Sequence, residues 1–247
     1  MLIVHLSDLH CGKKWFSPGS LALAIEEINE LKPDMVVVTG DLTENGFLKE
    51  YELAKEYLDR IKCKRVIIGT GNHDYRSTGY LLSQRYFKRP ELLKHKNAIV
   101  TYLSTARPDK DGGEVGFRQL QWLKRILDEN REKFKVVALH HHMIPIPDTG
   151  LERTTINDAG DVIRALTQSN VDLVLCGHRH RPWCLHLDST TILNAGTVSS
   201  EKFRGFFANS YNIIKVRKKK IDAKIKVVGG DTLDFKKILK ENEPFIP

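Results

Sequence analysis

A chain of 247 residues can form one α/β domain or two smaller ones, and 41% hydrophobic with 28% charged residues excludes collagen, coiled coils and disordered chains. Its longest apolar runs fall far short of the roughly 20 residues of a membrane-spanning helix, and its first residues lack the basic region of a secretory signal, so we expect a cytoplasmic protein with no membrane partner. The net charge of +8 is concentrated in the lysine-rich segment 215–226, which leaves the rest of the chain closer to balance.

Predicted strands and helices alternate through the first 176 residues. Apolar and β-branched runs predict strands at residues 2–6, 35–39, 65–69, 98–103, 134–139 and 172–176. Helical spacing of apolar residues predicts helices from Ser17-Pro18 to Leu31, and over residues 48–61, 117–128 and 159–166. Strands that alternate with helices of this length predict an α/β fold with a largely parallel sheet covered by helices.

The last quarter of the chain predicts short strands instead. They lie at residues 184–187, 191–193, 211–216 and 224–228, and we expect the last two to form a hairpin through the lysines at 218–220. No linker rich in Gly, Ser or Pro interrupts the sequence. We therefore predict a single domain over residues 1–247, with a C-terminal tail, residues 231–247, at its periphery.

Polar clusters follow five of the predicted strands. In chain order these clusters are Asp8-Leu9-His10, Gly40-Asp41, Asn72-His73-Asp74, His140-His141-His142 and His178-Arg179-His180. In open α/β sheets the carboxyl ends of the strands line one crevice, so we expect all five clusters to meet there. One Asp or His after a strand is commonly a helix cap, but five at corresponding positions predict a single site.

The residue types in these clusters indicate a metal centre. Imidazole, carboxylate and amide oxygen suit Mn, Fe or Zn, and four cysteines without a C-x-x-C pair offer no thiolate cluster. The candidate ligands number seven, which suits two ions better than one: Asp8, His10, Asp41, Asn72, His140, His178 and His180. Asp41 is the expected bridge between the ions. Two such ions attract an anionic substrate and are a known arrangement for displacement at phosphorus.

Together these blocks resemble the calcineurin-like metallophosphoesterases, and Asn194-Ala195-Gly196-Thr197 resembles a further block of that family. The resemblance implies a four-layer α/β/β/α sandwich whose second sheet is built partly from the short strands after residue 182. It implies that one ion is held by Asp8, His10, Asp41 and His180, and the other by Asp41, Asn72, His140 and His178. His73 would face the substrate as general acid or charge stabiliser.

Two features bear on the details of this resemblance. The run 139–147 is most similar to the bacterial and archaeal cyclic-nucleotide phosphodiesterases, the class III branch, but it has three consecutive histidines. Family order selects His140, directly after the strand, while His141 or His142 is the alternative ligand. Arg153 could clamp a phosphate through its guanidinium, or could be a solvated loop residue.

The first functional interpretation is hydrolysis of a small phosphodiester, such as a 3′,5′-cyclic nucleotide, by attack of metal-bound hydroxide. A nuclease or phosphomonoesterase of the same superfamily is the second interpretation, and a metal-free protein-binding scaffold on the same fold is the third. The lysine-rich segment could meet nucleic acid through phosphates, but it lacks interleaved aromatic residues for base stacking. A small phosphodiester is therefore the favoured partner.

Overall fold

The computed structural model describes residues 1–12, 14–87, 92–150, 155–206 and 208–240. Its strands form two sheets of six. The first sheet has the order β12-β11-β10-β1-β2-β3, and its strands are β1 (Leu2–Leu6), β2 (Met35–Val38), β3 (Val66–Ile68), β10 (Ser210–Arg217), β11 (Lys220–Val227) and β12 (Thr232–Asp234). The strands β1, β2 and β3 run parallel, whereas β10 joins β1 antiparallel and begins an antiparallel extension through β11 and β12.

The second sheet has the order β4-β5-β6-β7-β9-β8. Its strands are β4 (Leu93–His95), β5 (Ala98–Leu103), β6 (Phe134–Leu139), β7 (Leu173–Cys176), β8 (Trp183–Leu187) and β9 (Thr190–Asn194). The four central strands are parallel and the two edge strands are antiparallel. Because β8 and β9 come from the region after residue 182, they confirm that part of the second sheet is built there.

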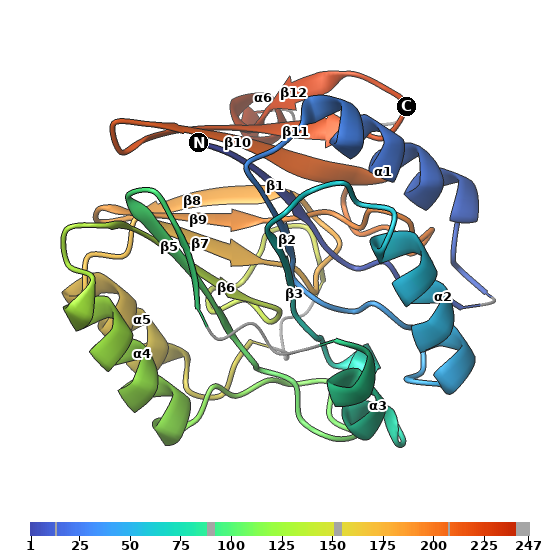
Figure 1. The fold of residues 1–247 in the computed structure, drawn as a ribbon, viewed down its shortest axis with the longest axis horizontal. Coiled ribbons are helices and arrows are strands. Elements are labelled where there is room, and N and C mark those ends of the chain that lie inside the picture. The colour runs from blue at the N-terminus through green and yellow to red at the C-terminus, as the bar shows by residue number, and fades with distance from the viewer. Residues whose placement is uncertain (13, 88–91, 151–154, 207, 241–247) are drawn as a thin grey trace.

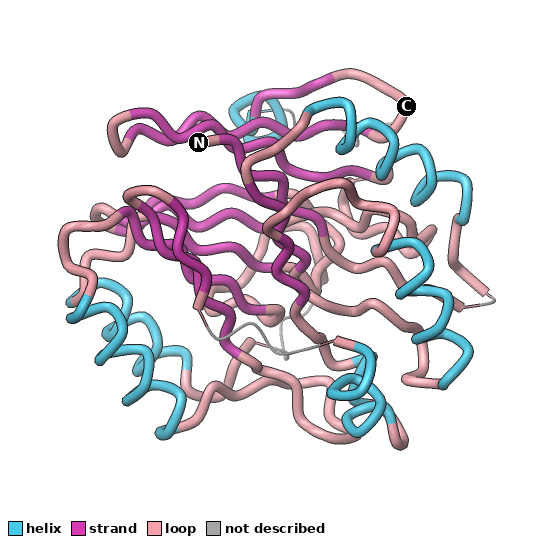
Figure 2. The backbone as a smooth tube through the Cα atoms, in the orientation of Figure 1, coloured by secondary structure: helices cyan, strands magenta, loops and turns pink. Residues whose placement is uncertain are grey.

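Helices cover the outer face of each sheet (Figures 1 and 2). The first sheet is covered by α1 (Pro18–Leu31), α2 (Leu48–Leu58) and α3 (Gly79–Tyr86), and the second by α4 (Phe117–Glu129) and α5 (Ala159–Gln168). A third apolar core lies between the two sheets and includes Ile3, Val37, Val136 and Leu175, all fully buried. The fold is therefore the expected α/β/β/α sandwich.

Local sequence explains how α1 begins and ends. The Ser17 side chain accepts a hydrogen bond from the amide of Ser20, and Pro18 occupies the first turn, where no backbone donor is lost. Leu21, Ile25 and Ile28 form the buried stripe that packs on the first sheet. Lys32 then takes a left-handed conformation, with φ of 48°, and ends the helix.

Several elements were not predicted from the sequence. These are α3, β4, β12, the 3₁₀ turn η1 (His73–Tyr75) and the final helix α6 (Phe235–Lys240). Within the predicted tail, β12 pairs with β11, and Phe235 is buried in the core between the sheets. The single domain itself stays a prediction.

The predicted hairpin is present between β10 and β11. Its turn residues, Lys218 and Lys219, have φ of 48° and 64°, the positive values that a tight two-residue hairpin turn requires. Among the described residues, no helix has the length and apolar character needed to cross a membrane.

Candidate metal centre

The seven predicted metal ligands lie at the carboxyl ends of strands from both sheets. Asp8 and His10 follow β1, Asp41 follows β2, Asn72 follows β3, His140 follows β6, and His178 and His180 follow β7. Six of these side chains are buried, and His178 is half-buried. The structure thus brings together residues that are up to 172 positions apart in the chain.

Asp8, His10 and His180 form a first ligand cluster. The Nε2 atoms of the two imidazoles are 2.9 Å apart, and Nε2 of His180 lies 3.3 Å from Oδ1 of Asp8. The carboxylate of Asp8 also accepts the backbone N–H of His178, at 3.0 Å to Oδ2. Two imidazole nitrogens and one carboxylate oxygen of this cluster therefore lie within 4.8 Å of one another.

Asn72, His140 and His178 form a second ligand cluster around an amide oxygen. Oδ1 of Asn72 lies 3.2 Å from Nε2 of His140 and 3.0 Å from Nδ1 of His178. The rings of His140 and His178 meet nearly edge to face, with centroids 5.2 Å apart. The cluster offers one oxygen and two nitrogens to a common point.

Asp41 lies between the two ligand clusters. Its Oδ2 is 3.7 Å from Nε2 of His10 in the first cluster and 3.3 Å from Nε2 of His140 in the second. Its Oδ1 accepts the backbone N–H of His73 at 2.9 Å, which fixes the orientation of the carboxylate. This is the position that a bridging ligand requires.

The donor set fits metal cations, as the hydrogen bonds of three imidazoles show. Nδ1 of His10 faces Oε2 of Glu44 at 2.8 Å, Nδ1 of His140 faces the carbonyl of Thr39 at 2.8 Å, and Nδ1 of His180 faces the carbonyl of Lys202. Carboxylates and carbonyls only accept, so each Nδ1 carries a proton, and each ring would present a lone pair at Nε2 to a bound cation. The Nε2 lone pairs of His10 and His180, 2.9 Å apart, would repel each other unless a cation lies beside them. A hydrogen bond at the other ring nitrogen, here Nδ1, is typical of metal-binding histidines.

Contacts in the triple-histidine run favour His140 over its neighbours. Both ring nitrogens of His141 have other partners: Nδ1 lies 2.8 Å from the hydroxyl of Thr105, and Nε2 lies 2.9 Å from the carbonyl of Asp111. His141 still lies near His140 and His178, with atoms within 4.8 Å. The ring of His142 stacks on that of His178 at 5.6 Å. The selection of His140 stays a prediction that these contacts support.

At Asp41 and His140, burial and the neighbouring charges act on the pKa in opposite directions. Burial alone would raise the pKa of Asp41 and lower that of His140, but their attraction to each other, added to that of the neighbouring charges and hydrogen bonds, outweighs it. The pKa of Asp41 is well below its usual range, and the pKa of His140 is raised to about 9. The carboxylates thus favour a positive charge at His140, whether a proton or a metal ion.

Five of the seven predicted ligands have a left-handed backbone. The φ values are 56° at Asp8, 51° at His10, 50° at Asp41, 73° at His178 and 52° at His180. Few residues other than glycine adopt this conformation, and it costs of order 1–3 kcal/mol at each position. Such a concentration of strain is typical of functional sites.

Glu44 is a participant that sequence reasoning missed. Its carboxylate contacts Nδ1 of His10 and pairs with Nζ of Lys202 at 2.6 Å, while the carbonyl of Lys202 contacts His180. The backbone carbonyl of Glu44 accepts a hydrogen bond from Nδ1 of His73 at 2.7 Å. The only sign of Glu44 in the sequence is its position three residues after Asp41. Its partners could not be recognised from the sequence, because they lie up to 158 residues away.

Asp74, in the same sequence block as Asn72, contacts backbone amides and is not one of the candidate metal ligands. It accepts hydrogen bonds from the backbone N–H groups of Leu42, Thr43 and Gly71, at 2.8 to 3.1 Å. These bonds tie the loop after β2 to the loop after β3. Asp74 therefore supports the segments that carry Asp41 and Asn72.

A cavity of about 270 Å³ opens onto the ligand clusters. His73 lines it, and burial lowers the pKa of His73 to about 4 despite the nearby Asp41, so the free side chain is neutral at neutral pH. Cationic side chains also line it: Arg76, Arg179, Lys202 and Arg204. This cavity suits an anionic ligand. Arg153, the predicted phosphate clamp, lies outside the described residues.

Comparison with known proteins agrees with this geometry. The family model for calcineurin-like phosphoesterases matches residues 1–182. The chain belongs to the calcineurin-like phosphoesterase family. Among its relatives is a "probable cyclic nucleotide phosphodiesterase" of Rhodococcus erythropolis, 28% identical over 197 residues, which cover 72% of this chain and 64% of the relative. The chain thus spans less than two thirds of that protein.

The chain is also similar to a second named relative and to a solved structure. A "probable glycerophosphodiester phosphodiesterase" of Arcobacter nitrofigilis is 26% identical over 227 residues, covering 81% of this chain and 80% of the relative. The purple acid phosphatase structure from yellow lupin (Lupinus luteus) superposes with a TM-score of 0.73 at 13% identity, covering 100% of this chain and 56% of that one. At such identity the superposition establishes the fold only. The expected resemblance to the family, and to its cyclic-nucleotide branch, is confirmed.

Proposed function

We propose that this member of the family is a metal-dependent phosphodiesterase that hydrolyses a small phosphodiester, with 3′,5′-cyclic nucleotides as the favoured class. The observation that carries the proposal is the placement of Asp41 between two ligand clusters, 3.7 Å from His10 and 3.3 Å from His140. The substrate class follows from the names of relatives such as the Rhodococcus protein. The Arcobacter relative also bears the name of a phosphodiesterase.

In this proposal the two ligand clusters each hold one ion of the Mn, Fe or Zn class. Asp8, His10 and His180 hold the first ion, Asn72, His140 and His178 hold the second, and Asp41 serves both. Such ions, when bound, polarise phosphoryl oxygens and lower the pKa of water. The chain supplies the orientation of each imidazole through the hydrogen bond at its far nitrogen.

His73 is the proposed proton donor or charge stabiliser. Its Nδ1 is held by the carbonyl of Glu44, which leaves Nε2 for a ligand in the cavity. The negative charge of a bound phosphodiester opposes the effect of burial on the pKa of His73 and favours the imidazolium form. Arg76 and Lys202 line the cavity as partners of Asp111 and Glu44, so the positive charge that attracts the anionic substrate comes mainly from Arg204 and from the bound ions.

A combined metal and substrate assay tests the proposal. The purified chain is loaded with Mn, Fe or Zn in turn, its metal content is measured, and turnover is followed on cyclic nucleotides, linear diesters, phosphomonoesters and short oligonucleotides. We expect close to two ions per chain and the highest kcat/KM on a small diester. Highest turnover on monoesters would contradict the diesterase assignment.

Two other outcomes would favour the alternative functions. Preference for oligonucleotides, with affinity that falls steeply as salt rises, would indicate a nuclease, with the lysine-rich turn of the β10–β11 hairpin as a candidate contact. A folded protein that takes up no metal from any of the three solutions would indicate a binding scaffold. The expected cytoplasmic location stays a prediction of the sequence.

A further inference from the structure

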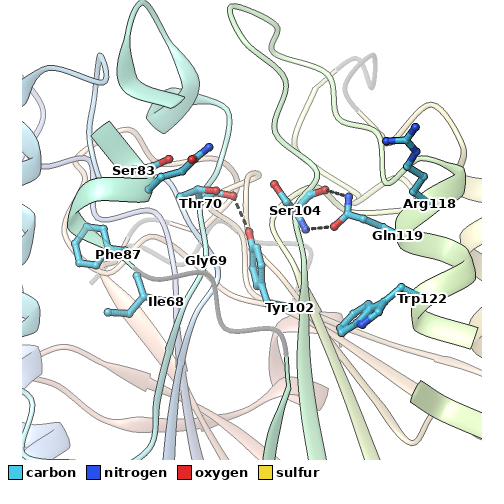
Figure 3. Close-up of a pocket in the computed structure, with 11 residues that line it drawn as sticks. Ile68, Gly69, Thr70, Ser83, Phe87, Tyr102, Ser104, Arg118, Gln119 and Trp122 are labelled. Carbon is cyan, nitrogen blue, oxygen red and sulfur yellow. Dashed lines mark hydrogen bonds between the residues drawn. The ribbon is translucent and has the colours of Figure 1, made fainter. Parts of the chain in front are cut away.

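A second cavity lies at the side of the sandwich, away from the ligand clusters, and we call it the edge cavity. It measures about 270 Å³ and lies between α3 and α4, where β3 and β5 end (Figure 3). None of its lining residues also lines the cavity at the ligand clusters. A ligand of the edge cavity therefore needs no contact with the metal centre.

Three aromatic rings line this cavity. Phe87 follows α3 on one side, Trp122 projects from α4 on the other, and Tyr102 of β5 lies between them (Figure 3). The Tyr102 ring packs directly on Gly69, where an added Cβ would lie 2.0 Å from Cε2 of the ring. The absence of a side chain at Gly69 is thus what lets the Tyr102 ring lie there.

Most polar groups of the lining already have partners. The Tyr102 hydroxyl donates to the carbonyl of Thr70 at 2.6 Å. The side-chain amide of Gln119 accepts a hydrogen bond from the backbone N–H of Ser104 at 3.0 Å and donates one to the backbone carbonyl of Ser104 at 2.8 Å. Ser83 donates to the carbonyl of Tyr80 at 3.0 Å. The interior of the edge cavity therefore presents mainly apolar surface to a ligand.

Arg118 provides the charge at this cavity. Its side chain is exposed, stands one helical turn before Trp122 on α4, and lines the cavity. No carboxylate of the described residues lies within 4.0 Å of its guanidinium, unlike Arg107 and Arg164, which pair with Glu114 and Asp161. A guanidinium matches a carboxylate in geometry and charge.

From this lining we propose that the edge cavity binds a small planar aromatic monoanion, with its rings among Phe87, Tyr102 and Trp122 and its carboxylate at Arg118. A cavity of about 150 Å³ holds one benzene ring, so about 270 Å³ suits two fused rings.

Calorimetric titration with 2-naphthoate as the probe tests this site. We expect a Kd below about 1 mM for the metal-loaded protein. Arg118→Gln should weaken binding of 2-naphthoate about tenfold or more and leave binding of the uncharged 2-naphthalenemethanol unchanged. Arg125→Gln is the matched control, because Arg125 lies on the same helix outside the edge cavity, and it should change neither affinity.

Two more variants separate the edge cavity from the metal centre. Trp122→Leu should weaken both probes, with folding checked by circular dichroism, whereas Asp41→Asn should leave both affinities unchanged. No binding at all would overturn the proposal. Equal losses in Arg118→Gln and Arg125→Gln would also overturn it, as would a loss in Asp41→Asn alone, which would place the probe on the metals. None of these results depends on phosphodiesterase activity.

Discussion

The two ligand clusters are held in different ways. In the first cluster, His10 donates its second hydrogen bond to the carboxylate of Glu44, and His180 donates its second hydrogen bond to the backbone carbonyl of Lys202. Glu44 and Lys202 are linked to each other by an ion pair of 2.6 Å. In the second, His140 is held by the carbonyl of Thr39, directly after β2, and His178 faces the amide oxygen of Asn72. The first cluster depends on a charged pair, Glu44 and Lys202, whereas the support of His140 in the second is a backbone carbonyl, so side-chain substitutions should weaken the two clusters unequally.

The largest expected effect comes from the residue that the clusters share. Asp41→Asn keeps the size of the side chain but removes the charge that serves both clusters, so metal content should fall by at least one ion per chain. Turnover should fall at least about 10⁴-fold, which corresponds to about 5 kcal/mol. Elemental analysis and steady-state kinetics measure both quantities.

Asp74→Asn is the matched control for the bridge. It changes a buried carboxyl group that accepts from backbone amides and contacts none of the imidazoles. It should keep both ions. Equal metal loss in the two variants would show that Asp41 is not the bridge.

A second prediction separates the clusters. His140→Gln should remove the ion of the second cluster, leave the first occupied, and lower turnover by about 10²–10³-fold. His141→Gln should keep both ions, because both ring nitrogens of His141 already contact Thr105 and Asp111. If His141→Gln is instead the variant that loses metal, the assignment of His140 is wrong.

Loss of the His73 side chain should lower turnover mainly on substrates with a poor leaving oxygen. General acid catalysis contributes about 10²–10⁴-fold and is needed most when the leaving oxygen is a poor one. His73→Ala should therefore slow hydrolysis of a cyclic nucleotide by about 10²-fold and of a nitrophenyl diester far less, with metal content unchanged. Equal loss on both substrates would indicate charge stabilisation alone.

The smallest expected effect tests the side-chain support of the first cluster. Glu44→Gln weakens the acceptor at Nδ1 of His10 and should lower metal affinity by about 10- to 100-fold at one site. Lys202→Met keeps the backbone carbonyl that contacts His180, so its effect should be smaller. Metal titrations with a competing chelator compare the two, and a larger effect of Lys202→Met would contradict this account.

The strand-end pattern explains how the sequence could predict that the seven candidate ligands lie together. Asp8, Asp41 and His140 each follow a local apolar run, and the carboxyl ends of parallel strands meet wherever the sheets form. Short elements such as β4 and β12, of three residues each, carry too little periodicity to be recognised. Glu44 needs tertiary information, because its contacts with His10 and Lys202 join segments 34 and 158 residues apart.

The pairing of β1 with β10 was also beyond local sequence. Leu2 lies opposite Lys215, and this register unites the two ends of the chain in one sheet. Nothing in either segment alone specifies the other as its neighbour. The family resemblance implied two sheets, but the division of the late strands between them, with β8 and β9 in one and β10 to β12 in the other, came from the structure.

The left-handed backbone at five of the candidate ligands restricts how the site can be engineered. Asp and His are among the few residues other than Gly that tolerate such φ values, so Asp8 and His180 are selected twice, once for their donor atoms and once for their backbone. Glutamate at position 8 would retain a carboxylate but is less suited to that conformation. A library screened for heat resistance alone would favour glycine or asparagine at these positions, and would discard the proposed metal ligands as it gained stability. Stabilised variants of this chain are therefore best selected on turnover and melting temperature together.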